Sequence, residues 1–142
     1  GGFMAKNNRS KARELAFKLV FEDTFGTSTA TEMLGNLFEE EKDFDGLEQA
    51  NIDYINWVRT AVKEHRDELD GIISRFAKGW KLERMSRVDL SILRLALCEI
   101  NYLDGVTPAI AINEAVELAK KYSADNAPSF INGILGTYIR SL

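Results

Sequence analysis

The residues able to do acid–base, nucleophilic or metal chemistry are few in this sequence. It holds one histidine, His65, and one cysteine, Cys98. His65 stands in a polar stretch typical of a protein surface, and Cys98 stands in an apolar helical run typical of a buried, inert thiol. A single cysteine excludes an internal disulfide, and a single histidine excludes a His-rich metal site. Glu114 and Glu117 share one helix face, but the lysines beside them favour a solvated surface over a catalytic carboxylate pair.

Sequence motifs of the common enzyme classes do not occur. There is no phosphate-binding loop, dinucleotide-binding glycine pattern, zinc-protease pattern or nucleophile elbow. The acidic segment 39–46 lacks the residue order of a calcium loop and is interpreted as a solvated loop or a frayed helix end. No secretion signal and no apolar run long enough for a bilayer are found, so we expect a cytoplasmic protein that does not contact a membrane. We expect no enzymatic activity, no cofactor and no metal ion.

Charge is distributed unevenly along the chain. The 142 residues carry a net charge of −4, which argues against a generic nucleic-acid binder. Residues 6–18 nevertheless hold five cations against Glu14, a net charge of +4, which leaves −8 for the rest of the chain. The five cations are Lys6, Arg9, Lys11, Arg13 and Lys18. This asymmetry indicates either a basic arm for an anionic partner or the solvated face of an amphipathic helix.

Apolar residues recur at helical spacing along most of the chain, and no useful strand-like alternation or long-period repeat occurs. The fold class predicted is all-α, with about seven helices in one compact domain spanning residues 4–142. Residues 1–3, which precede Met4, are interpreted as an expression-tag remnant. The predicted helices cover approximately residues 12–20, 29–38, 52–62, 69–76, 88–100, 108–119 and 127–138.

Several helix starts carry capping signals. Ser86 and Asp89 form a capping-box pair, in which the Ser86 hydroxyl accepts from the backbone N–H of Asp89 and the Asp89 carboxylate bonds back. Thr107 precedes Pro108, which suits the first helical position because proline lacks an N–H. Asp125 or Asn126 is expected to cap the last helix.

Two side chains in the apolar runs have more than one interpretation. Arg94 interrupts the run that follows Asp89, so it lies at the edge of the core or is paired within it, and Glu114 is the predicted partner. Phe130 stands close to the apolar residues Ile131 and Ile134, so it fits either a core position or an exposed aromatic surface.

Four segments resemble motifs of the NusB family of bacterial transcription antitermination factors. Residues 89–100 resemble the family helix D-x-x-I-L-R-L-A-x-x-E-L, and residues 111–120 match A-I-N-E-A-V-E-L-A-K. Residues 130–135 match F-[IV]-N-G-[IV]-L, and residues 13–21 resemble R-x-x-A-x-x-x-L-Y with Phe21 in place of tyrosine. The segments occur in the family order and spacing, from about Arg9 to Tyr138.

This resemblance implies an all-α fold of two small packed helical bundles. It also implies binding of the boxA element of nascent ribosomal RNA, a single-stranded RNA, together with NusE, a small-subunit ribosomal protein. The pair would join the RNA polymerase antitermination complex that also holds NusA and NusG. The state of the free protein, monomer or homodimer, stays open.

The resemblance also implies roles for particular residues. The basic N-terminal region binds RNA in the family, which corresponds to Arg9, Lys11 and Arg13. Phe130 opens the third motif and is implicated in RNA binding, by stacking on an unpaired base. Asp89 opens the first motif and is the expected contact to NusE.

The sequence departs from the family at Asn8 and Ser10, where some members carry arginine, so we expect weak RNA affinity without a partner protein. Two alternatives remain. NusB-like domains also occur as accessory RNA-binding domains fused to RNA methyltransferases, although few residues follow Leu135 in this sequence and we expect no such fusion. The second alternative is a helical scaffold that binds only protein, and the retained cations Arg9, Lys11 and Arg13 count against it.

Overall fold

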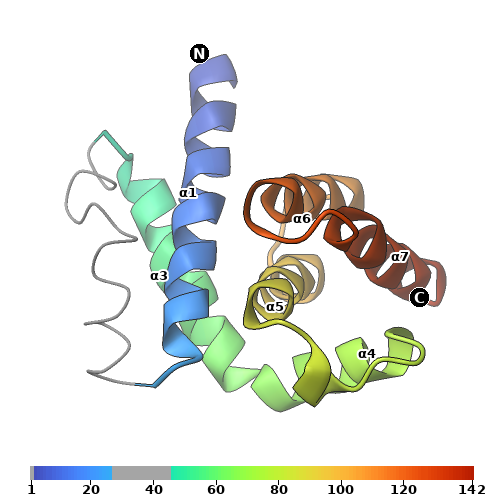
Figure 1. Ribbon diagram of the computed structural model, residues 1–142. Helices are drawn as coiled ribbons and strands as arrows, with labels where there is room; N and C mark the ends of the chain where they lie inside the picture. The colour runs from blue at the N-terminus through green and yellow to red at the C-terminus, as the bar shows by residue number, and fades with distance from the viewer. Residues whose placement is uncertain (1, 27–45) are drawn as a thin grey trace. The chain divides into compact units, whose positions relative to one another are not determined.

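The computed structural model describes residues 2–26 and 46–142, with side chains described from residue 9 (Figure 1). The described residues form helices and no strand, so the all-α prediction is confirmed for this part of the chain. The predicted helix 29–38 and nearly all of the acidic segment 39–46 lie outside the described residues. Six α-helices and one short 3₁₀ helix are described: α1 (Gly2–Asp23), α3 (Gln49–Glu64), α4 (Arg66–Phe76), η2 (Leu82–Arg84), α5 (Arg87–Tyr102), α6 (Pro108–Tyr122) and α7 (Ala127–Arg140).

The chain divides into two compact units, Gly1–Thr60 and Ala61–Leu142, called here the first and the second unit. In the first unit, α1 and α3 are joined by a bidentate ion pair. The Arg59 guanidinium donates to both carboxylate oxygens of Asp23 over 2.7 Å each. These hydrogen bonds raise the pKa of Arg59 above its ordinary value. Thus the C-terminal end of α1 is fixed to the middle of α3.

In the second unit, α5 is the central helix. All ten residues from Leu90 to Glu99 are buried, as expected of a helix covered on every side rather than along one stripe. Helices α4, α6 and α7 pack on α5, and α6 packs along α7 (Figure 1). Alanines 111, 115 and 119 are buried on α6, and their small side chains let neighbouring helices approach closely. The hydroxyl of Tyr138 on α7 donates to Asn101 Oδ1 of α5 over 2.6 Å.

The buried guanidinium of Arg94 on α5 is paired with Asp70 of α4. Its Nε and Nη2 atoms donate to the two carboxylate oxygens over 2.7 and 3.0 Å, and its side chain is 4% exposed. The prediction that Arg94 lies paired within the core is confirmed, but the prediction of Glu114 as its partner is wrong. The carboxylate comes instead from the helix that precedes α5.

The predicted helix starts are confirmed in position, with one change in bonding. Ser86 caps α5, since its hydroxyl accepts from the Asp89 N–H over 3.0 Å, and Thr107 caps α6 ahead of Pro108. Asn126 precedes α7 as expected, but its side chain makes no capping hydrogen bond. The glycine stops Gly26, Gly79 and Gly105 follow the ends of α1, α4 and α5, and their φ angles are positive and near +80°, which other residues rarely adopt. Across residues 2–26 and 46–142, no helix is long and apolar enough to span a membrane.

Replacing Asp70 with asparagine is expected to lower the free energy of unfolding by about 3 kcal/mol, because it leaves the Arg94 guanidinium buried without a counter-charge. Urea denaturation measures the change. Asp67→Asn, an exposed carboxylate on the same helix, is the matched control and should cost less than about 1 kcal/mol. The double variant Asp70→Leu, Arg94→Met should recover most of the loss. Equal effects of the Asp70 and Asp67 changes would contradict a buried pair.

Candidate nucleic-acid interface

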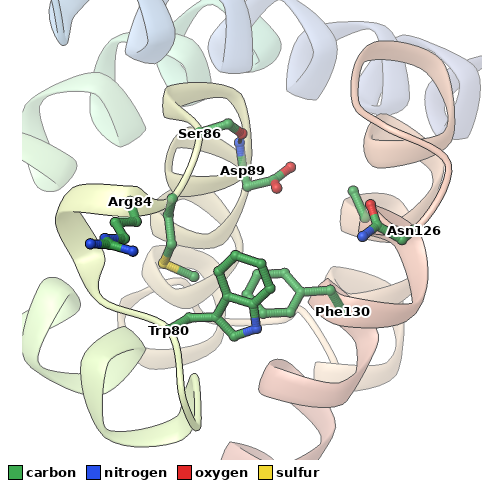
Figure 2. Close-up of a pocket in the computed structure, with 8 residues that line it drawn as sticks. Trp80, Arg84, Ser86, Asp89, Asn126 and Phe130 are labelled. Carbon is green, nitrogen blue, oxygen red and sulfur yellow. Dashed lines mark hydrogen bonds between the residues drawn. The ribbon is translucent and has the colours of Figure 1, made fainter.

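A small pocket of about 110 Å³ lies in the second unit, between the α4–α5 connection and the start of α7. Its wall combines two aromatic rings, a guanidinium, a carboxylate and an amide. Figure 2 shows the two rings at the centre, with Arg84 on one side and Asn126 on the other. The lining residues are Trp80, Arg84, Met85, Ser86, Asp89, Asn126, Ala127 and Phe130.

Phe130 is half-buried, which answers the question that the sequence left open between core and surface. It lies one residue before Ile131, which is fully buried in the core of the second unit. The Phe130 ring meets the Trp80 indole edge to face, with ring centroids 5.7 Å apart and the planes at 64°. Trp80 is 54% exposed. The two rings, called here the aromatic pair, thus present an accessible aromatic surface rather than a closed core contact.

Asp89 lies at the edge of the same pocket, in the first turn of α5. Its backbone N–H donates to Ser86, but its carboxylate accepts from the hydroxyl of Ser123, at the end of α6, over 2.6 Å. The predicted reciprocal bond from Asp89 back to Ser86 is therefore replaced by a bond between α5 and α6. This bond fixes the half-buried carboxylate beside the aromatic pair.

The predicted cations of α1 differ in exposure. Lys11 is exposed, and Arg9 is partly covered, with its guanidinium carbon 4.5 Å from the centre of the Tyr54 ring on α3. A guanidinium over an aromatic face keeps its charge and can still donate to an anion. Arg13 is only 5% exposed. Of the three residues, Arg13 is therefore the least available to a phosphate.

The structure brings two of the five predicted site residues together. Asp89 and Phe130 line one pocket of the second unit, whereas the three cations belong to the first unit. Sequence reasoning missed Trp80, Arg84 and Asn126. One signal could have found the first two, because residues 78–87 hold four cations and a tryptophan between two predicted helices. Asn126 was considered only as a helix cap.

The candidate reactive residues have structural roles. Cys98 is fully buried, and burial raises the pKa of its thiol to about 12, so the thiol stays protonated at neutral pH. The His65 ring stacks on Tyr102 with centroids 4.0 Å apart. Within the part of the chain that the structure describes, no group of three His, Cys, Asp or Glu residues is placed to hold a metal ion. Binding, not catalysis, is what the described side chains support.

Phe130→Ala is expected to cost about 1 kcal/mol of unfolding free energy, because its ring is half-buried and loses mainly the contact with Trp80. Ile131→Ala, the neighbouring core residue, should cost about 2–5 kcal/mol. Urea denaturation of both variants under one condition gives the comparison. A loss at Phe130 as large as that at Ile131 would place the Phe130 ring in the core.

Comparison with known proteins identifies relatives of this chain. The NusB family model matches residues 10–140. The transcription antitermination protein NusB of Clostridium novyi is 41% identical over 134 residues, which cover 94% of this chain and 99% of the relative. The NusB structure from T. maritima superposes with a TM-score of 0.77 at 28% identity, covering 93% of this chain and 90% of that chain.

A solved complex of the antitermination factors NusB and NusE with double-stranded RNA also contains a similar chain. Its TM-score is 0.77 at 24% identity, with 96% of this chain and 98% of that chain covered. At this identity, the likeness concerns the fold alone. The family match over residues 10–140, together with a relative that is 41% identical and matched over 99% of its own length, shows that the chain belongs to the NusB family of transcription antitermination proteins.

Proposed function

We propose that this chain acts in the cytoplasm as an antitermination factor that binds the boxA element of nascent ribosomal RNA together with the ribosomal protein NusE. The pair would join the RNA polymerase complex that holds NusA and NusG. The observation that carries the RNA-binding part is the half-buried Phe130 ring, which lines an open pocket instead of the core. Its role is to stack on an unpaired base. Members of the NusB family are non-enzymatic, so this role is one of binding.

The cations of α1 support the electrostatic part of the proposal. Lys11 is exposed and Arg9 is partly so, and each can bind one phosphate. Arg13 is assigned a weaker part because it is buried. Two phosphate contacts on a chain of net charge −4 predict weak binding to RNA alone. This agrees with a protein that needs a partner to hold RNA.

Asp89 is proposed as the contact to NusE. Its carboxylate is half-buried and fixed by Ser123, so a partner would meet a carboxylate that is already oriented. One carboxylate oxygen accepts from Ser123, and a carboxylate has further lone pairs for a donor of the partner. Asp89 lies near Phe130 in the same pocket wall, so RNA and protein partner would meet at neighbouring positions.

Two alternative functions stand behind this proposal. An accessory domain of an RNA methyltransferase would bind RNA without NusE, and a protein-only scaffold would bind NusE without RNA. The relative from C. novyi is matched over 99% of its own length and is named as an antitermination protein. This favours an antitermination factor over the two alternatives. Retained cations in α1 count against the protein-only scaffold.

A gel-shift titration with a boxA-containing single-stranded RNA, with and without purified NusE protein, separates these functions. We expect weak binding by this chain alone and binding at least tenfold tighter when NusE is present. A duplex of the same sequence should bind more weakly than the single strand, because its bases are not free to stack. Equal RNA affinity with and without NusE would favour the accessory domain. Binding of NusE, with no binding of RNA under any condition, would favour the scaffold.

The cations of α1 are tested by the dependence of RNA affinity on salt. The double variant Arg9→Ala, Lys11→Ala should flatten the slope of log affinity against log salt by about 1.4 units, since each phosphate contact to a single strand contributes about 0.7. Lys18→Ala, on the same helix but paired with Glu14, is the control and should leave the slope nearly unchanged. An unchanged slope in the double variant would exclude these cations from the RNA site.

A further inference from the structure

The segment 78–87, called here the basic connector, joins α4 to α5 and includes η2. It holds Lys78, Lys81, Arg84 and Arg87 against Glu83, a net charge of +3 in a chain of −4. All four cations are exposed. Within residues 9–26 and 46–142, Lys78, Lys81 and Arg84 have no ion-pair partner. The basic connector is therefore a second local excess of positive charge, separate from that of α1.

Trp80 lies inside the basic connector and is held in place by a tight turn. Gly79 has a φ of +79°, and the Trp80 N–H donates to the carbonyl oxygen of Ala77 over 3.1 Å. Because glycine adopts this backbone conformation at little cost, the chain can reverse directly after α4 and present the indole. The Phe130 ring then supports the indole edge to face. A large aromatic side chain fixed in this way and 54% exposed is suited to stack on a planar ligand.

The pocket beside the aromatic pair is of a size to hold one planar ring. Its volume of about 110 Å³ is well below the roughly 300–1,000 Å³ of sites that enclose a whole small molecule. Arg84 supplies donors, and Asn126 supplies both a donor and an acceptor in a side chain that makes no capping bond. An aromatic face bordered by such groups matches a nucleobase, which has a flat face and an edge of donors and acceptors.

Charge favours RNA over an apolar or basic peptide as the occupant. A nucleotide brings a flat base together with a phosphate, and the basic connector places exposed cations on both sides of Trp80 in the sequence. An apolar or basic peptide segment would bring no negative charge to pair with these cations. An unpaired nucleotide can both stack on the aromatic pair and pair its phosphate with these cations.

We propose that the aromatic pair stacks on one unpaired nucleobase of bound RNA, that Arg84 and Asn126 bond to the edge of this base, and that the remaining cations of the basic connector bind the flanking phosphates. This inference rests on the proposed function and adds to it a second stacking residue, Trp80, and a second set of phosphate contacts.

The first experiment uses Trp80 as a reporter. The chain has two tryptophans, so Trp57→Phe leaves Trp80 alone, and 5-fluorotryptophan incorporated into this chain gives one fluorine resonance. Single-stranded boxA RNA is added in the presence of NusE protein, with binding followed separately by gel shift. We expect the Trp80 resonance to move in step with RNA binding. A resonance that does not move while RNA binds would overturn the stacking role and leave the proposed function standing.

The second experiment measures RNA affinity in variants. Trp80→Ala should weaken binding on the order of 5- to 150-fold, and Trp80→Phe should restore most of it, because stacking needs an aromatic face. Trp57→Ala is the matched control and should bind as the parent protein does. Since Trp80 is exposed, its removal should leave the circular dichroism spectrum unchanged. Unchanged RNA affinity in Trp80→Ala, or a loss of NusE binding alone, would overturn the proposal.

The phosphate contacts of the basic connector are tested separately. Lys78→Gln with Lys81→Gln should flatten the salt dependence of RNA affinity by about 1.4 units. Lys120→Gln, on α6 and paired with Glu117, is the matched control. A salt slope equal to that of the control would remove the basic connector from the RNA site. If the parent protein itself does not bind RNA, with or without NusE, the proposed function fails.

Discussion

The ion pair between Arg94 and Asp70 is the interaction on which the second unit depends most directly. A guanidinium that is 4% exposed is tolerated only with a carboxylate in contact, so α4 must lie against α5 at this level. With α4 and α5 fixed in this way, the connection between them has to turn sharply at Gly79 and run back to Ser86. That path places Trp80 and η2 beside the N-terminal end of α5. Because α7 also packs on α5, the Phe130 ring can reach the indole.

Two physical effects with different ranges are proposed to hold RNA. Stacking on the aromatic pair acts only at contact, and it can hold one base in a fixed place. The cations of α1 and of the basic connector act over roughly a Debye length, about 8 Å at physiological salt, and they attract phosphates without selecting sequence. The acidic remainder of the chain repels phosphates and so opposes the attraction by these cations. We therefore expect this chain to bind RNA weakly by itself and more tightly when a second protein adds contacts.

Much of the fold follows from local sequence signals. Helical spacing of apolar residues, the caps at Ser86 and Thr107 and the glycine stops predict nearly every described helix, because these signals act within a few residues. The short helix η2 was missed, since three residues carry too little periodicity. The partner of Arg94 was also missed. Asp70 and Glu114 are both plausible carboxylates in the sequence, and only the packing of α4 on α5 decides between them.

The site was predictable in part. Asp89 and Phe130 came from a family resemblance, and the pocket that they share became visible only in the structure. Charge counting found the cations of α1 but did not separate exposed Lys11 from buried Arg13, because a net charge carries no information on burial. The same counting, applied to residues 78–87, indicates the basic connector. This count also indicates Trp80 as part of the segment, but its contact with Phe130, fifty residues further along the chain, is visible only in the structure.

The aromatic pair of the second unit is proposed to contact an unpaired base of bound RNA. Photo-crosslinking tests it most directly, with boxA RNA carrying 4-thiouridine at single positions, in complex with this chain and NusE, and with the crosslinked residues identified by mass spectrometry. We expect one RNA position to crosslink to Trp80 or Phe130 and its neighbours to crosslink within the basic connector. Crosslinks from every RNA position that avoid both the aromatic pair and the basic connector would contradict it.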